Sequence, residues 1–339
     1  MNKTSQNSLA HLVASRQFRY YYTRLSHEMQ EGYDKMLDGY LKHQDSISIK
    51  ASSIDAAWEI HRALCYDVPE VFFIKALKAS YNPLLSTVIV YPEYRFDYDT
   101  CLNLLGRMEE QTGSFVQRIA ILSDQEKVKQ IHDYIVRNVT YKDLNAPYSH
   151  ESPGVLIYGI AVCEGIAKAF KYLSDRVNIN SIVIAGDAFD DIQQTNPIGH
   201  AWNIVFIATT PYHVDTTFDY SVSNGHVIRY DYFLLSDRQI KRDHIFEEQL
   251  ACNVCFEFYQ IIGLYAGSKK TLQDLVRKKL RPGKPLVVKT PDFQEKAEKV
   301  AEKFLEIVIG AISVSYDSKL TVSLMYNDSR KVFQFELCY

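Results

Sequence analysis

The chain has 339 residues, of which 47% are hydrophobic and 23% are charged, close to the composition of an average folded protein. This composition excludes global disorder, and no apolar run approaches the roughly 18–20 residues of a transmembrane helix. The formal net charge of -3 excludes a global electrostatic attraction to nucleic acid. Tyrosine is unusually abundant: the 24 Tyr, with 17 Phe and 2 Trp, can fill a core and also line a groove.

The first third of the chain is predicted to mix helices and strands. Between Phe18 and Tyr40, apolar residues recur every three or four positions, which predicts one long amphipathic helix. The patterns that follow predict a strand at 46–50, a helix at 55–65, strands in VPEVFFIKAL and STVIVYPEY, and a helix around 99–118.

The middle of the chain begins with a strong helix start. Ser123, with Glu126 three residues later, forms a capping box at the beginning of SDQEKVKQIHDYIVRNV. The loop YKDLNAPYSHESPG, rich in turn formers, leads into VLIYGIAVCEGIAKAFKYLSDRV. Three strand-like runs come next: NSIVIAGDA, HAWNIVFIA and YHVDTTFD.

The last part of the chain is predicted to combine a helix with short strands. The loop PGKPLVVKTPDF precedes a helix with Thr290 as its N-cap and Pro291 at its first position. The end, from Ile312 to Leu337, predicts three short strands with DS and NDS turns. We therefore expect three domains: a mixed module at 1–120, a core at 121–250, and a module of helix and antiparallel strands at 251–339.

The cysteines and the N-terminus bear on the compartment. The six cysteines are scattered, and the N-terminus lacks the apolar region of a secretory signal, so we expect a cytoplasmic protein with reduced thiols, or a secreted one if a signal was trimmed. Cys252 and Cys255 form a CNVC that resembles half of a zinc site, but no second Cys/His pair has zinc-finger spacing. We expect core packing there, a solvated acidic loop at Asp187, Asp190 and Asp191, and no bound metal or cofactor.

Cys163 is the best candidate for a nucleophile. It lies in the first turn of a predicted helix, where the macrodipole and unpaired backbone N–H groups favour a thiolate and could hold an oxyanion. Gly159 and Gly165 on either side would allow a substrate backbone to come close. Free cysteines are often buried, so plain core packing is the alternative.

His200 and Asp215 could complete the chemistry. Imidazole titrates in the range needed to activate a thiol, and a carboxylate fixes its tautomer and stabilises its cation. Cys163, His200 and Asp215 follow one another on a predicted helix and two predicted strands. A tight hairpin between those strands would leave Asp215 more than about 10 Å from His200, so a direct bond needs a bulge or a shifted register. Asp219 is the next acid to consider.

The segment from Ser123 to His244 resembles the transglutaminase-like family of papain-like cysteine enzymes, and in particular its bacterial members. The resemblance is carried by VCEGIAKAFKYL, GHAWNIV and YHVDTTFD, and extends to YDYFLLSDRQIKRDH. It implies an α+β fold in which a helix with the cysteine packs on an antiparallel sheet that carries His and Asp. By the same resemblance Cys163 is the nucleophile, His200 the base and Asp215 the orienting acid.

The resemblance also suggests secondary site residues and a reaction. Tyr148, Tyr158 and Trp202 are candidates for an oxyanion or groove role, although packing against the histidine is the expected role of Trp202. The implied activity is acyl transfer from protein or peptide amides through a thioester, with hydrolysis slightly favoured over transamidation. The alternative is a catalytically silent interaction module. We expect no nucleic-acid partner, since the basic segment 269–289 belongs to an acidic chain, and the sequence leaves the oligomeric state open.

Overall fold

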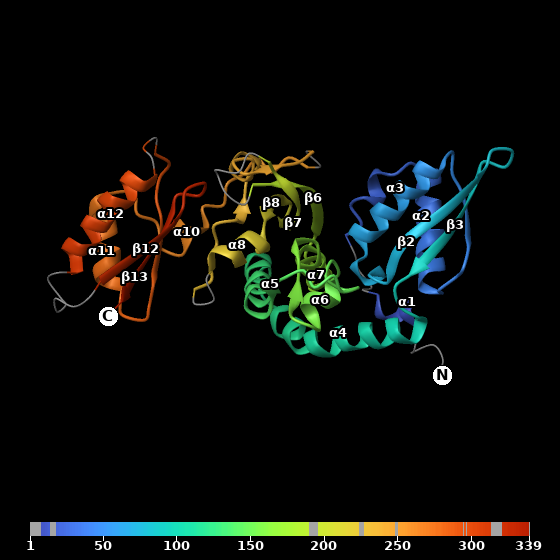
Figure 1. The fold of residues 1–339 in the computed structure, drawn as a ribbon, viewed down its shortest axis with the longest axis horizontal. Helices are drawn as coiled ribbons and strands as arrows, with labels where there is room; N and C mark the ends of the chain where they lie inside the picture. The colour runs from blue at the N-terminus through green and yellow to red at the C-terminus, as the bar shows by residue number, and fades with distance from the viewer. Residues whose placement is uncertain are drawn as a thin grey trace. The chain divides into compact units, whose positions relative to one another are not determined.

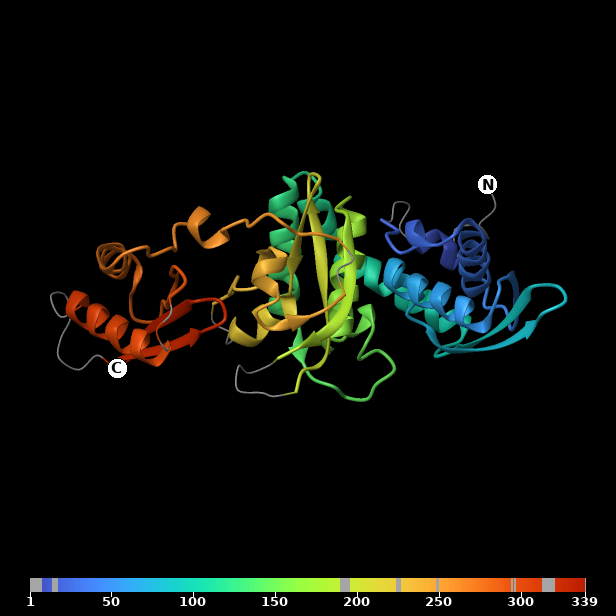
Figure 2. The same ribbon diagram turned by 90° about the horizontal axis from the view of Figure 1, so that it is seen from above.

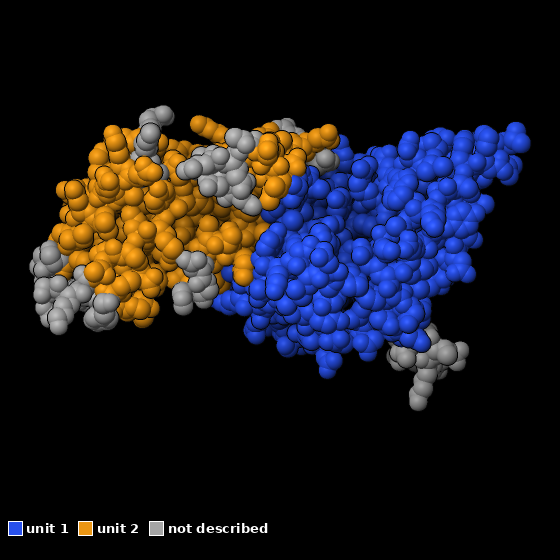
Figure 3. Space-filling view, viewed as in Figure 1, with its two compact units in different colours: residues 1–186, 199–211 blue, residues 187–198, 212–339 orange. Residues whose placement is uncertain are grey.

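The computed structural model describes residues 8–13, 18–189, 196–223, 227–247, 250–293, 295, 297–312 and 321–338. The chain divides into two compact units, shown in different colours in Figure 3. Unit 1 comprises residues 1–186 and 199–211, and unit 2 comprises residues 187–198 and 212–339. No helix among the described residues is long and apolar enough to cross a membrane. The predicted three-domain boundaries stay a prediction.

Unit 1 opens with a helical pair on a small sheet. After α1 (Leu9–Leu12) and the short η1 (Tyr22–Arg24), helix α2 spans His27–Leu41 and α3 spans Ile54–Asp67. The antiparallel sheet has the order β1–β3–β2, formed by Ile47–Lys50, Thr87–Tyr94 and Ile74–Asn82. Helices α2 and α3 lie along this sheet in Figure 1.

Two predictions for this region need correction. The helix expected from Phe18 starts only after Ser26, whose hydroxyl accepts the N–H of Met29 at 3.3 Å, because the N–H groups of Tyr21 and Tyr22 donate to the carboxylate of Asp67 instead. The expected strand VPEVFFIKAL begins as a short 3-10 helix, η2 (Pro69–Val71), and only its end belongs to β2.

Four helices follow this sheet in the described part of unit 1. They are α4 (Tyr98–Ile119), α5 (Asp124–Asn138), α6 (Ser152–Leu156) and α7 (Cys163–Arg176). The Ser123 half of the capping box predicted for α5 is confirmed, since the Ser123 hydroxyl accepts the N–H of Glu126 at 3.4 Å. Helices α4, α5 and α6 all contact α7, which places α7 at the centre of this group.

A five-stranded sheet follows α7 in the chain, and its strands contribute to both units. The order is β10–β6–β7–β8–β9, with bounds His244–Ile245, Ser181–Ala188, Ile198–Ile207, Thr210–Val214 and Phe233–Leu235. Two short helices, α8 (Thr216–Ser223) and α9 (Asp237–Ile240), lie between these strands in the chain. The three predicted strand runs are therefore present, although the third ends early.

The C-terminal module, from α11 to β13, is a helical pair on a second small sheet. After α10 (Phe258–Ile261), its elements are α11 (Lys269–Lys279), β11 (Leu286–Lys289), α12 (Ala297–Ile312), β12 (Thr321–Asn327) and β13 (Val332–Cys338). The sheet has the order β11–β13–β12, and a buried apolar core joins it to both helices. Figure 2 shows α12 beside the sheet.

The C-terminal predictions are only partly confirmed. The segment expected as a loop contains β11, and α12 starts at Ala297, not after Thr290. Thr290 instead bonds the 328–331 turn, through its hydroxyl to the carbonyl oxygen of Lys331 at 3.3 Å. The first of the three expected strands falls on 313–320, outside the described residues. Helices and largely antiparallel sheets together give the predicted α+β fold.

Candidate active site

Cys163 is the first residue of α7, as predicted. Val162 is the N-cap, and the apolar residues Ile166, Phe170 and Leu173 are buried, so one face of the helix is fixed in the core. The thiol itself is half-buried. A partly exposed thiol at a helix N-terminus has the two properties that a nucleophilic cysteine needs, since it can be reached and its thiolate is favoured.

The backbone before α7 holds this helix start in place. Strands β4 (Thr140–Tyr141) and β5 (Ile160–Ala161) pair in parallel, and the N–H of Val162 donates to the carbonyl of Ser149 at 3.0 Å. A Cβ on Gly165 would lie 2.8 Å from that same carbonyl oxygen, and one on Gly159, where φ is +66°, would lie 3.0 Å from a backbone carbonyl. At both glycines the space that a Cβ would fill is next to a carbonyl oxygen of this chain's own backbone. This corrects the expectation that the two glycines make room for a substrate backbone.

A network of charges surrounds the start of α7. Lys168 is buried and its Nζ lies 2.9 Å from the carboxylates of both Glu151 and Glu164. Burial acts to raise the pKa of Glu164, but the charge of Lys168 and a hydrogen bond from His150 lower the pKa to about 2. The pKa of His150 is raised, mainly by its hydrogen bond to Glu164 and in part by Cys163. A cationic His150 would in turn favour a thiolate at Cys163.

His200 lies on β7 in unit 1 and is buried. Its ring stacks with that of Trp202 at a centroid distance of 5.9 Å. Asn203 in the same HAWN segment ties β7 to the cysteine helix, because its side-chain amide donates to the carbonyls of Ala167 at 3.0 Å and Ile182 at 3.3 Å. This hydrogen bond to Ala167 supports the expectation that the helix with the cysteine packs against the strand with the histidine. Trp202 is fully buried, in keeping with a packing role.

Asp215 belongs to unit 2 and lies just after β8, not on a strand. Its Oδ1 accepts the N–H groups of Thr217 at 2.9 Å and Phe218 at 3.0 Å, so it caps α8. The expectation that the whole run YHVDTTFD forms a strand is therefore wrong, because this cap begins a helix at Thr216. The register of β7 against β8, and with it a direct bond from Asp215 to His200, stays a prediction.

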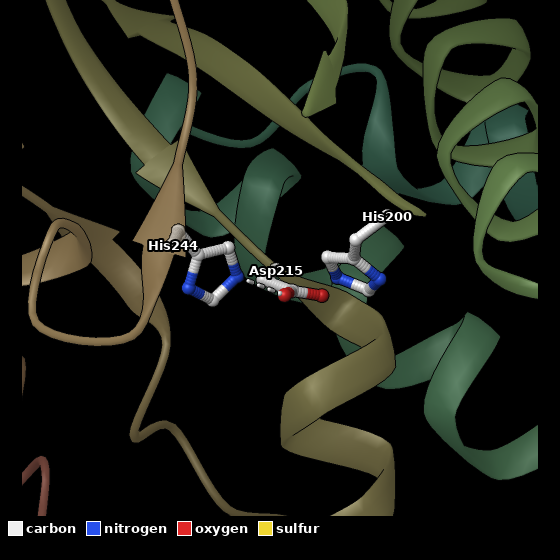
Figure 4. A group of neighbouring side chains, drawn as sticks. All are labelled: His200, Asp215 and His244. Carbon is white, nitrogen blue, oxygen red and sulfur yellow. Dashed lines mark hydrogen bonds and ion pairs between the residues drawn. The ribbon is translucent and has the colours of Figure 1, made fainter. Parts of the chain in front are cut away.

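The acid has a partner that the sequence did not suggest. Nε2 of His244, on β10, lies 2.9 Å from Oδ2 of Asp215, and both side chains are fully buried. The dashed line in Figure 4 marks this bond; the third labelled residue, His200, comes from unit 1. Nδ1 of His244 lies 2.8 Å from Oδ1 of Asp243. The resemblance reaches His244, but only tertiary structure brings it to an acid 29 residues earlier.

Three other candidates occupy defined positions. Tyr148 and Tyr158 stack on each other with ring centroids 4.0 Å apart, and Arg107 lies over the ring of Tyr158. Asp219, the alternative acid, is buried and accepts the N–H of Tyr232 at 2.9 Å. Nothing in these contacts assigns an oxyanion role to either tyrosine, which stays a prediction.

One group in unit 2 has donors that suit a metal ion. His213, Asp237 and Cys252 place their donor atoms within 4.8 Å of one another, and such donors are common zinc ligands. They are already bonded among themselves, since Nε2 of His213 and the N–H of Cys252 each lie 2.8 Å from the Asp237 carboxylate. Cys255 instead donates to Glu257, so CNVC does not act as a pair. The predicted acidic loop includes Asp190 and Asp191, which lie outside the described residues.

Comparison with known proteins gives one firm match. Residues 113–216, which include Cys163, His200 and Asp215, match the family model of the Transglutaminase-like superfamily. No curated protein matches the chain.

Several solved structures are similar at low identity. One is a proposed cysteine protease from Cytophaga hutchinsonii, 15% identical over 42% of this chain and 61% of that one, with a TM-score of 0.26. A second is described as a TGase, 13% identical over 42% of this chain and 44% of that one, with a TM-score of 0.28. A third is a proposed protease from Parabacteroides distasonis ATCC 8503, 14% identical over 41% of this chain and 35% of that one, with a TM-score of 0.23. The chain thus spans 35–61% of the length of these structures, and TM-scores this low support no conclusion on fold or function.

Proposed function

We propose that the protein is a thiol acyl-transfer enzyme of the transglutaminase-like superfamily, whose family model matches residues 113–216, with Cys163 as nucleophile, His200 as base and Asp215 as orienting acid. The observation that carries the proposal is the position of Cys163, half-buried at the first residue of α7 inside the matched segment. A thiol placed there is both reachable and favoured as thiolate.

The reaction begins with attack of the Cys163 thiolate on an amide carbonyl carbon. The carbonyl oxygen takes up the electron pair and accepts hydrogen bonds from N–H groups at the start of α7. His200, as imidazolium, protonates the departing amine, the C–N bond breaks and a thioester remains. Asp215 keeps the imidazole in the tautomer that this step requires and stabilises its cation.

Two fates are open to the thioester, and the same residues serve both. Water gives hydrolysis, as in a protease or deamidase, whereas a substrate amine gives transamidation and a cross-link. We place hydrolysis first, because transamidation requires a site that excludes water and accepts an amine. A protein or peptide is the proposed substrate in either case.

A catalytically silent interaction module is the alternative function. The flanking helical pairs on small sheets, at both ends of the described chain, are what favours it, since the matched domain leaves them unexplained. Against it, the matched segment contains Cys, His and Asp together, and binding alone needs none of the three.

Mass spectrometry of a protein mixture tests these possibilities together. The mixture is incubated with the full chain or with Cys163→Ala, and Cys255→Ala serves as a matched control because Cys255 is exposed and distant in sequence. New termini indicate proteolysis, a gain of about 1 Da indicates deamidation, and cross-links that release ammonia indicate transamidation. Products that form equally with Cys163→Ala, or no products with any form of the protein, contradict the proposal.

A further inference from the structure

An unbroken row of charged side chains runs from Asp215 to the C-terminal module. Asp215 bonds Nε2 of His244, Nδ1 of His244 bonds Asp243, and Asp243 bonds the Nη2 of Arg330. All four side chains are buried, and all four residues belong to unit 2. Asp215 is the next-to-last residue of the matched segment, and the other three lie beyond it.

We propose that His244 is a positioning residue that holds Asp215 charged and fixed, and that Arg330 extends this control to the C-terminal module. The inference rests on the proposed function, because it assumes that Asp215 orients the base.

The hydrogen bonds define the charge of His244. Each ring nitrogen faces a carboxylate oxygen, at 2.9 Å and 2.8 Å, and an ionised carboxylate can only accept. A neutral imidazole has one N–H, so only the imidazolium can donate to both carboxylates at once. Charges then alternate along the row, negative at Asp215 and Asp243 and positive at His244 and Arg330. Such alternation is what permits four charged groups to be buried together.

Arg330 has several further contacts within unit 2. It follows β12, and its guanidinium also bonds the backbone carbonyls of Gln239 and Ile240. It lies 4.4 Å from the centroid of the Tyr232 ring, and the Tyr232 hydroxyl donates to Asp243 at 2.8 Å. Asp243 thus receives three partners, from β10, from the C-terminal module and from Tyr232.

The direction of the Asp243 pKa shift is consistent with these contacts. Burial acts to raise the pKa of Asp243, but the hydrogen bond from His244 and the charge of Arg330 outweigh it, and the pKa is lowered. His213 is a further titratable group that feels the charge of His244; its pKa is lowered, mainly by burial. Tyr232 is a further titratable neighbour of His244, 5.9 Å away between ring centroids.

The consequence for Asp215 follows from its surroundings. Its Oδ1 is held by two N–H groups at the start of α8 and its Oδ2 by a cation. A carboxylate has about four acceptor positions, so these three bonds are compatible with a further one to an imidazole. Loss of the His244 charge would leave a buried carboxylate that keeps its proton to higher pH. In acid, Asp215 would then be protonated, and His200 would lose the carboxylate that orients it.

The rate at which iodoacetamide alkylates Cys163, followed by mass spectrometry from pH 4 to 9, tests the inference without a known substrate. His244→Ala removes both bonds and the charge, His244→Gln keeps a donor toward Asp215 but no charge, and Arg330→Met removes the far cation. Arg242→Met is the matched control, because Arg242 bonds Asp292 and the Ser329 carbonyl at the same turn but is exposed and outside the row.

We expect the acid limb of the alkylation profile to move to higher pH by about one unit in His244→Ala, by less in Arg330→Met, and not at all in Arg242→Met. His244→Gln should restore part of the rate lost by His244→Ala but keep the shifted limb. Melting curves identify the folded variants, and a merely structural role would lower the alkylated fraction equally at every pH.

The outcomes separate the two proposals. A wild-type Cys163 that reacts no faster than a free peptide thiol at pH 6 overturns the proposed function. A reactive Cys163 whose pH profile is unchanged in folded His244→Ala and Arg330→Met leaves the function standing and overturns the role of His244.

Discussion

The surroundings of Cys163 and of Asp215 are built in opposite ways. Around the cysteine most ionic contacts join near neighbours in the chain, since Glu164 pairs with Lys168 one helical turn later and with His150 in the preceding loop; Glu151 of the same network also reaches Arg95. Around the acid they join residues that are far apart in the chain, 29 positions for Asp215 and His244 and 87 positions for Asp243 and Arg330. The first group is partly exposed and the second is fully buried. A nucleophile must be reached by substrate, whereas an orienting acid is better shielded from water, because its bonds are stronger there.

The largest expected effect on thiol reactivity concerns the histidine that activates the thiol. His200→Gln should slow Cys163 alkylation near neutral pH by about 10²-fold or more, because a general base is lost. His150→Gln is the matched control, since His150 also influences Cys163 but is half exposed. Its rate should change by less than about fivefold. If the two variants exchange these results, the base is His150 and the assignment of His200 is wrong.

A buried ion pair elsewhere in unit 2 should matter most for the free energy of unfolding. Arg229 makes a bidentate pair with Asp231 at 3.0 and 2.7 Å, and both side chains are buried. Arg229→Met leaves that carboxylate buried without its cation, which should reduce the free energy of unfolding by about 3–5 kcal/mol in urea titrations. The exposed pair in Arg242→Met should cost less than about 1 kcal/mol. Equal losses in the two variants would show that burial does not distinguish them.

Acid should reduce the contribution that Glu164, next to Cys163, makes to the stability of the fold. Its pKa falls from the usual 4.5 to about 2 in the folded chain, so its contribution to stability is complete above about pH 4.5 and is lost as the pH falls toward 2. At neutral pH Glu164→Gln should be less stable than wild type by about 2 kcal/mol, allowing for partial exposure. Urea unfolding at pH 7 and pH 3 should show this gap closing on acidification; a gap that is constant with pH contradicts the charge network.

The smallest expected effect comes from a cap. Ser123→Ala removes the side-chain acceptor for the Glu126 N–H at the start of α5, which should cost about 1 kcal/mol. Ser123→Asp retains an acceptor and should restore most of the loss. Thermal melting of both variants checks this, and identical melting temperatures would show that the cap contributes nothing.

The same contrast explains what the sequence could predict. The helix with Cys163 and the cap at Ser123 depend on neighbours within one or two turns, and both predictions are confirmed. The roles of His244 and Arg330 were not predicted, because nothing in the local pattern pairs either with an acid far away in the chain. The strand expected through Asp215 failed for a related reason, since an aspartate between alternating residues can also cap a helix. The residues around Thr290 are typical of a helix N-cap, but its hydroxyl bonds the carbonyl oxygen of Lys331 in the 328–331 turn and α12 starts only at Ala297.

A competition between two thiols of the same molecule tests the central claim most directly. Cys163 lies at a helix N-terminus. Cys255 is exposed and donates to Glu257, and partial burial together with that carboxylate raises the pKa of Cys255 to about 12. A short pulse of iodoacetamide at pH 6, followed by peptide mass spectrometry, compares their labelling. We predict that Cys163 is alkylated at least about tenfold faster than Cys255 and than a free peptide thiol. Labelling of Cys163 at or below the rate of the free peptide thiol would contradict its role as the nucleophile.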